Sequence, residues 1–108
     1  MEINEYQKLA MTTMNKELSD RELLINSVMG LCGESGEVID IVKKHISHGH
    51  PLDKDKLIAE LGDVAWYLAE CAFVLGVELE EVMRGNIEKL KKRYPDGFEK
   101  EKSINRAE

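Results

Sequence analysis

The sequence predicts an all-α protein, a single four-helix bundle-like domain that shares its core in a homo-oligomer. Apolar residues recur at three- and four-residue spacing along most of the chain, and no long stretch alternates with a period of two. The 108 residues include only eight glycines and two prolines, and Pro51 and Pro95 mark breaks between helical stretches. A chain of this length forms one domain, residues 1–108, whose core is thin, so we expect a dimer or a tetramer.

Local signals place the ends of the expected helices. Ser19 or Asp20 caps the second helix, Asp53 caps the third, and Gly76 ends the third. Acidic residues near the start of the fourth helix and basic residues near its end suit the helix dipole. Few apolar side chains follow, so residues 96–108 are expected to form a surface tail. The four helices are expected over about residues 4–18, 21–46, 54–75 and 78–93.

Composition and charge argue against several classes of protein. The net charge of −6 disfavours binding to a nucleic-acid duplex, because such binding depends on basic side chains that meet phosphates. No run of 18 apolar residues is present, so we expect no membrane span, and the N-terminal stretch lacks the apolar block of a signal peptide. Cys32 and Cys71 cannot form a disulfide framework and suit a reducing, cytoplasmic location. His45, His48 and His50 match no four-ligand zinc site, so we interpret them as part of a surface loop.

Four acidic residues lie beside the apolar stripes of the two long helices. Glu34 and Glu37 in the second helix, and Glu60 and Asp63 in the third, are each three residues apart, so each pair shares a helix face. The stripes, which we expect to face the core, comprise Leu24, Val28, Leu31, Val38, Ile41, Val42 and Ile46, and then Leu57, Leu61, Val64, Leu68, Cys71 and Leu75. The sequence therefore predicts four carboxylates near a buried seam between two helices.

Carboxylates at a buried seam need compensation, because removing an unpaired charge from water is costly. Protonation, cationic side chains or divalent cations can each provide it. The donors are all oxygen and neither pair contains a histidine, which favours Mg²⁺, with Mn²⁺ as a substitute, over di-iron redox chemistry. The alternative is that both pairs lie on solvated helix faces.

Basic residues of the fourth helix are candidates for phosphate binding. Asn86, Lys89 and Arg93 are three and four residues apart and share one face. Lysine binds phosphate as a point charge and arginine as a fork of donors. The alternative is an ordinary solvated, basic helix end.

Two aromatic residues follow the acids of the third helix. Tyr67 lies one turn after Asp63, where its ring could stack on a base, although core packing is the alternative. Trp66 lies off the acidic face, and we interpret it as packing or as a subunit contact.

Three glycines interrupt the second helix at Gly30, Gly33 and Gly36. Each costs about 1 kcal/mol relative to alanine in a helix interior. Their density indicates a backbone that is approached closely, either by a neighbouring helix or by a ligand.

The motifs of the chain resemble the MazG-like nucleoside triphosphate pyrophosphohydrolases, which belong to the all-α NTP pyrophosphatase superfamily. The signature of that family is Glu-x-x-Glu followed by Glu-x-x-Asp, and here 22 residues separate Glu37 from Glu60. The resemblance covers about residues 3–106. It is carried by GLCGESGEV at 30–38, by ELGDVAWYL at 60–68 and by Asn86-x-x-Lys89-x-x-x-Arg93-Tyr94-Pro95.

This resemblance implies a MazG-type fold and a Mg²⁺-dependent reaction that splits a nucleoside triphosphate between its α- and β-phosphates. The products would be the monophosphate and pyrophosphate, and the role would be house-cleaning of the nucleotide pool. The metal ligands implied are Glu34, Glu37, Glu60 and Asp63; the catalytic residues implied are Glu37, Lys89 and Arg93; and the substrate contacts implied are Tyr67, Asn86, Lys89 and Arg93.

The chain departs from the family pattern at one position. Many members carry two adjacent acids at the start of the first motif, whereas here Gly33 precedes Glu34. The rival hypothesis for the whole chain is a non-catalytic, oligomeric helical interaction module.

Overall fold

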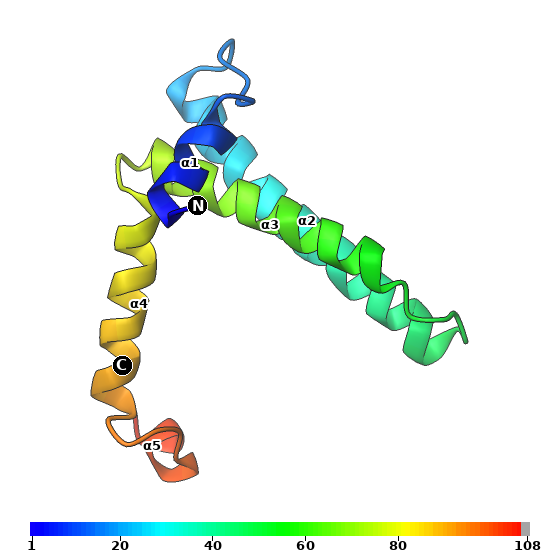
Figure 1. The fold of residues 1–108 in the computed structure, drawn as a ribbon, viewed down its shortest axis with the longest axis vertical. Helices are drawn as coiled ribbons and strands as arrows, with labels where there is room; N and C mark the ends of the chain where they lie inside the picture. Colours follow the sequence, from blue (N-terminus) through cyan, green and yellow to red (C-terminus); the bar gives the residue numbers. More distant parts are fainter. Residues whose placement is uncertain (107–108) are drawn as a thin grey trace.

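The structure is a computed structural model that describes residues 1–106. Within these residues the chain is helical and forms no strand, so the predicted all-α class is confirmed. The helices are α1 (Ile3–Met11), α2 (Asp20–Ser47), α3 (Lys54–Val74), α4 (Leu79–Arg93) and α5 (Lys100–Ile104) (Figure 1). None of the described helices is long and apolar enough to cross a bilayer.

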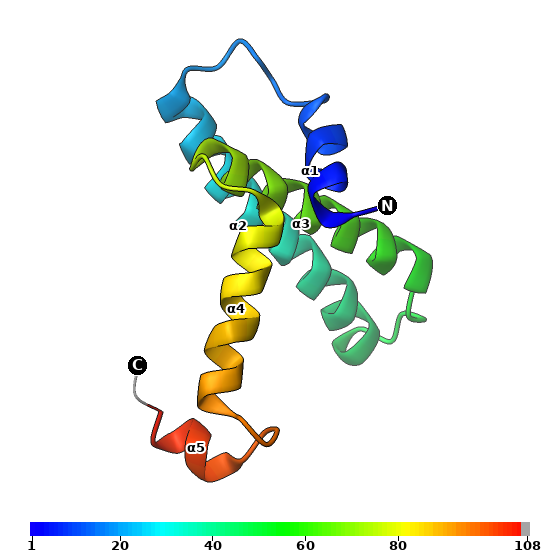
Figure 2. The same cartoon turned by 60° about the vertical axis from the view of Figure 1, so that its left-hand side comes forward.

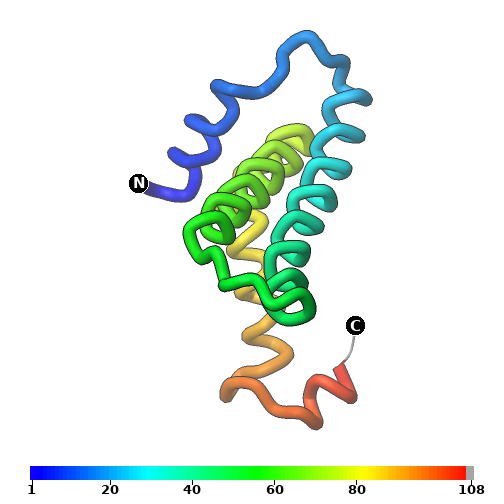
Figure 3. The backbone as a smooth tube through the Cα atoms, turned by 90° about the vertical axis from the view of Figure 1, so that its right-hand side faces the viewer, coloured from blue at the N-terminus to red at the C-terminus, as the bar shows by residue number. Residues whose placement is uncertain are grey.

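The two long helices, α2 and α3, lie side by side and antiparallel (Figure 3). The predicted caps are confirmed at both of their starts. Ser19 and Glu22 form a capping box at α2, in which each backbone N–H donates to the other's side chain at 3.2 Å. Asp53 caps α3 by accepting from the backbone N–H of Lys56 at 3.0 Å.

The first helix is shorter than predicted, because it ends at Met11 rather than near Leu18. The hydroxyls of Thr12 and Thr13 donate to carbonyl oxygens three residues earlier, at 2.6 and 2.9 Å. Such local side-chain bonds compete with the helical ladder and favour its end. A connecting loop therefore leads to α2 instead of a further helical turn.

The core of the single chain lies where α1 crosses α3 beside the start of α4. Ala10, Met11, Ala69 and Leu79 form this buried cluster. Trp66 packs against it, and its indole N–H lies 3.0 Å from the carbonyl oxygen of Ala10. The packing interpretation of this tryptophan is thus the one that the structure supports.

Side chains of α1 cap the start of α4. The backbone N–H of Leu79 donates to Oε1 of Gln7 at 2.8 Å, and the Gln7 side-chain amide donates to the carbonyls of Ala69 and Val77, both at 3.2 Å. The backbone N–H of Glu80 donates to Oδ1 of Asn4 at 3.0 Å. These bonds satisfy amides that a helix start leaves without a helical partner, and they set the direction in which α4 leaves the core.

The fourth helix does not pack along α2 and α3 but projects away from them (Figures 1 and 2). The radius of gyration is 17.0 Å, whereas a compact chain of this length has one of about 13 Å. The apolar stripes of α2 and α3 are therefore only partly covered in one chain. Of their thirteen members only Ile41 is buried, while Leu61 is 52% exposed and Ile46 is 74% exposed.

The segment expected to be a surface tail contains structure of its own. After α4 the chain turns at Gly97, which has a φ of 93°, and then forms the short helix α5. The rings of Tyr94 and Phe98 pack at a centroid distance of 5.3 Å across this turn. We call residues 79–106, which comprise α4, the turn and α5, the arm. Residues 107–108 of the expected tail lie outside the described part of the chain.

Candidate active site

Three of the four predicted metal ligands come together between α2 and α3. Glu34 on α2 and Glu60 and Asp63 on α3 each offer a carboxylate oxygen, and these oxygens lie within 4.8 Å of one another. We call these three residues the acid cluster. Glu34 and Glu60 are half-buried and Asp63 is exposed. The cluster forms because Glu60 and Asp63 are one turn apart and the antiparallel hairpin places Glu34 opposite them.

The electrostatics of the acid cluster favour a bound cation. The pKa of Glu34 is raised, first by its hydrogen bond with Glu60, then by desolvation, and then by the negative charges of Asp63, Glu60 and Glu37. The part of this rise that comes from the neighbouring negative charges reflects repulsion among the carboxylates, which a proton or a cation would relieve. All donors are oxygen, which is the ligand type preferred by Mg²⁺ and Mn²⁺.

The fourth predicted ligand, Glu37, lies one turn after Glu34 on α2. It is exposed, and it does not belong to the group of three carboxylates that could share an ion. It is nevertheless close enough for its charge to raise the pKa of Glu34. The structure therefore places it at the edge of the acid cluster.

Tyr67 packs against Gly30 across the helix pair. A Cβ atom at position 30 would overlap the Tyr67 ring, so this position requires glycine or a shifted ring. Beside Gly33 and Gly36, by contrast, the described residues place no atom within 4 Å of where a Cβ would be, apart from the adjacent residues and the backbone of α2 itself. Helix packing thus accounts for the first of the three glycines, and the other two border open space. Tyr67 also meets the Trp66 ring edge-on, at 5.0 Å between centroids.

Two residues near this seam escaped the sequence analysis. Tyr6 on α1 has a raised pKa, first because of burial and then because of the negative charge of Asp63, so the phenol lies near the acid cluster. Glu70 is only 1% exposed, and its pKa is raised by burial and partly restored by a hydrogen bond with Asn26. No spacing signal reveals either contact, because both depend on which helices pack together.

The predicted phosphate-binding residues lie on the arm. Asn86 and Lys89 are exposed and Arg93 is half-buried. The acid cluster uses the first half of α3, whereas α4 begins after the end of α3 and leads away from it (Figures 1 and 2). Within one chain, the structure does not bring these three residues to the acid cluster.

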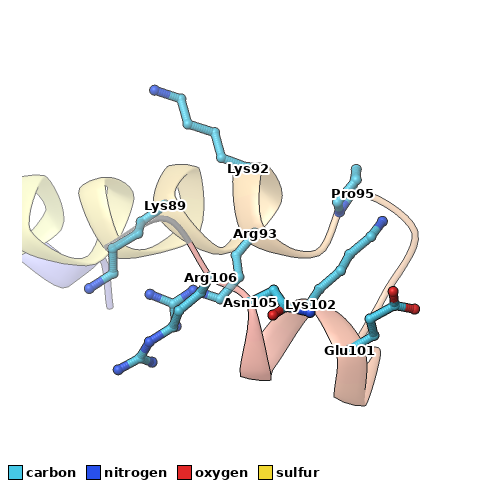
Figure 4. A pocket seen from close by; sticks show the side chains of 8 residues that line it. All are labelled: Lys89, Lys92, Arg93, Pro95, Glu101, Lys102, Asn105 and Arg106. Carbon is cyan, nitrogen blue, oxygen red and sulfur yellow. The ribbon is translucent and has the colours of Figure 1, made fainter.

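The arm instead forms a basic cavity of about 620 Å³ between α4 and α5. Figure 4 shows that Lys89, Arg93 and Arg106 extend to the same side of the arm. One acid, Glu101, also lines the cavity. The five basic lining residues are Lys89, Lys92, Arg93, Lys102 and Arg106. Such a lining suits an anion such as a phosphate.

Comparison with known proteins establishes the family. The family model for the MazG nucleotide pyrophosphohydrolase domain matches residues 24–98. The chain therefore belongs to this family, as the resemblance of its motifs predicts. A relative, the Gene 37 protein of Mycobacterium phage L5, is 42% identical over 73 residues, which are 64% of this chain and 64% of that protein. The chain thus spans less than two thirds of the length of this relative. No solved structure matches the chain.

Proposed function

We propose that this chain is a Mg²⁺-dependent nucleoside triphosphate pyrophosphohydrolase that serves nucleotide house-cleaning. It would cleave ribo- or deoxyribonucleoside triphosphates between the α- and β-phosphates. Water adds across the bridging P–O bond, and the products are a nucleoside monophosphate, pyrophosphate and a proton. The observation that carries this proposal is the convergence of Glu34, Glu60 and Asp63 inside the stretch that matches the family.

The acid cluster, with Glu37 beside it, would hold Mg²⁺, or Mn²⁺ in its place. Two oxygens bound to one Mg²⁺ at about 2.1 Å lie at most about 4.2 Å apart. The three carboxylate oxygens lie within 4.8 Å of one another, so small side-chain rotations would bring them into range. When bound, the cation would supply positive charge to the phosphates and make water a stronger nucleophile.

The remaining residues would take the roles that follow from their chemistry. Glu37 is exposed at the edge of the cluster, where a carboxylate could accept the proton of the attacking water. Lys89 and Arg93 would offset the charge on the phosphates, with Asn86 on the same helix face. Tyr67, one turn beyond Asp63, would contact the base.

Pyrophosphate release from a panel of canonical and modified nucleoside triphosphates, with and without Mg²⁺, tests this proposal. We expect a monophosphate and pyrophosphate as products, and no turnover with a chelator. Asp63→Asn should lower the rate by at least about 100-fold, since even the outer contacts of metal ligands are worth 10–100-fold. Asp55→Asn is the matched control, because Asp55 lies on the same helix, exposed in its first turn, and should retain activity.

A second measurement separates the enzyme from the rival interaction module. Mg²⁺ together with a non-hydrolysable triphosphate should raise the melting temperature of the wild-type chain, since a ligand that binds the native state stabilises it. Asp63→Asn should lose most of this increase. A folded chain that neither turns over any triphosphate nor responds to Mg²⁺ and nucleotide would overturn the proposal in favour of the module.

A further inference from the structure

We propose that Arg106, which follows α5, determines specificity by binding a chain of phosphates in the cavity of the arm, together with Lys89 and Arg93. This role deepens the proposed function and rests on it for the identity of the substrate, a nucleoside triphosphate. Arg106 lies outside residues 24–98, the stretch that matches the family, so membership of the family assigns it no part in the reaction. Three observations carry the inference, and they concern the position of Arg106, the charge of the arm and the size of the cavity.

The turn after α4 brings α5 back beside the last turn of α4 (Figures 1 and 2). Gly97, with its φ of 93°, allows this reversal, and its backbone N–H donates to the carbonyl oxygen of Tyr94 at 3.1 Å. The Tyr94 ring packs against Phe98 and also lies 5.9 Å from the guanidinium carbon of Arg93. Because these contacts hold the turn together, residues from both helices line one cavity.

Three cationic side chains extend to one side of this cavity. Lys89 and Arg93 come from α4, on which they are four residues apart, and Arg106 joins them from the segment that follows α5 (Figure 4). A guanidinium presents a planar fork of donors that fits two phosphate oxygens, whereas an ammonium acts as a point charge. Each fork can hold the oxygens of a separate phosphate, so the two arginines suit neighbouring phosphates of one chain.

The arm is the basic part of an acidic chain. Residues 79–106 contain eight basic and six acidic residues, whereas the whole chain has a net charge of −6. Lys89 and Arg106 form no ion pair with any carboxylate of the described residues. Lys102 is less available to a ligand, because it pairs with Glu99 at 3.5 Å. A polyanion is therefore attracted to this end of the molecule and repelled by the rest.

The size of the cavity suits a ligand larger than a single phosphate. Its volume of about 620 Å³ lies within the range of about 300–1,000 Å³ that is typical of small-molecule sites. A terminal phosphate carries about −1.5 to −2 charges at pH 7, and each further phosphate of a chain adds charge and acceptor oxygens. Affinity for the cavity should therefore rise from orthophosphate to pyrophosphate and then to triphosphate. In the proposed reaction, this favours the triphosphate substrate over the monophosphate product.

Titration calorimetry of the full chain with sodium tripolyphosphate tests the inference without catalysis. The buffer is free of divalent cations and low in ionic strength, so that neither a metal on the acid cluster nor screening by salt obscures the interaction. We expect tripolyphosphate to bind more tightly than pyrophosphate, and orthophosphate to bind most weakly. Arg106→Ala should weaken the binding of tripolyphosphate at least about 10-fold, because a hydrogen bond to a charged group is worth this factor or more.

Lys100→Ala is the matched control, because Lys100 is an exposed cation of α5 that is not part of the cavity lining. It should change the affinity for tripolyphosphate by no more than about 3-fold, which is the general effect of one lost surface charge. Arg106→Lys keeps the charge but not the fork, and its affinity should lie between those of the wild type and Arg106→Ala. Circular dichroism should show the same helix content in all variants, since Arg106 is exposed and lies beyond the end of α5.

Amide resonances of the ¹⁵N-labelled wild-type chain locate the bound anion. Tripolyphosphate should shift resonances in the last turn of α4 and in α5, and leave those around the acid cluster unchanged. Shifts confined to other parts of the chain, or equal affinities of the wild type and Arg106→Ala, would overturn the inference. Equal affinities for orthophosphate and tripolyphosphate would overturn it as well, because the cavity would then hold a single phosphate.

Turnover separates failure of the inference from failure of the proposed function. If both hold, Arg106→Ala should lower kcat/KM for a nucleoside triphosphate at least about 10-fold, mainly by raising KM, because the lost bond is made to the bound substrate. Tripolyphosphate binding that depends on Arg106, in a chain that hydrolyses no nucleoside triphosphate, would support the phosphate-chain site and overturn the function. An active chain in which Arg106→Ala leaves kcat/KM unchanged would support the function and overturn the role of Arg106 in specificity.

Discussion

Replacement of Gln7 by leucine provides a direct test of how α1 sets the direction of the arm. Gln7 is buried and makes three hydrogen bonds that join α1 to the end of α3 and the start of α4. Leucine has a similar volume and no polar atoms, so Gln7→Leu removes these bonds without leaving a large cavity. The predicted result is a loss of stability and a less firmly held α4.

The magnitude follows from the groups that lose their partners. The N–H of Leu79, on a residue only 2% exposed, would be left unsatisfied, which costs about 1–3 kcal/mol. The carbonyl of Val77 is less buried and loses one bond, worth about 0.5–1.5 kcal/mol. The carbonyl of Ala69 lies inside α3, where helical N–H groups also bond to carbonyls. The free energy of unfolding should therefore fall by about 2–4 kcal/mol.

Urea unfolding followed by circular dichroism measures this change, with the wild type at the same protomer concentration. The melting temperature should fall by at least about 8 °C, since about 4–8 °C accompanies each kcal/mol in a domain of this size. Lys8→Leu, at the exposed neighbouring position, is the control and should stay within about 0.5 kcal/mol of the wild type. If Gln7→Leu also stays within that range, the bonds do not hold α1 to α4 as argued.

Two further predictions concern the seam between α2 and α3. Gly30→Ala should destabilise the fold by about 1–3 kcal/mol, because the new methyl group meets a packed tyrosine ring. Gly33 borders open space, so Gly33→Ala should instead increase the stability of the fold by up to about 1 kcal/mol through its higher helix propensity. If urea unfolding shows that both substitutions change stability in the same direction, this assignment is wrong. Glu70→Gln should be more stable than the wild type near neutral pH, with a difference that shrinks as the pH falls through the raised folded-state pKa of Glu70 to the usual pKa of glutamate. Because burial raises the pKa of Glu70 in the folded state, stability is lost as the pH rises from its unfolded-state pKa through its folded-state pKa. A pH-independent difference between the two proteins would show that this carboxyl does not titrate as described.

The sequence alone determined the features that depend on neighbouring residues. The starts of α2 and α3 follow from Ser19 and Asp53, whose side chains bond to backbone N–H groups three residues later. The end of α3 is followed by Gly76 with a φ of 76°, as its place after the apolar run predicts. Such signals are readable because a cap or a C-terminal glycine acts within a single turn of its own helix.

Part of the candidate site was also within reach of sequence reasoning. The spacing of Glu60 and Asp63 puts both on one face of a helix, and a short connection between two long helices makes them antiparallel neighbours. Together these rules bring Glu34 opposite that face, which is where the structure has it. The position of Glu37 relative to the other three depends on side-chain directions that spacing does not specify.

Only the tertiary structure decided how much of each apolar stripe the chain itself covers. Periodicity shows that a helix has an apolar face, but it does not say whether the same chain, a partner or no protein at all packs against that face. The way α1 crosses α3 and α4 leads away determines three features that the sequence did not reveal. These are the exposure of Leu61, the burial of Glu70 and the approach of Tyr6 to Asp63. These are long-range contacts, set by the sum of many weak packing terms, and no local pattern encodes such a sum.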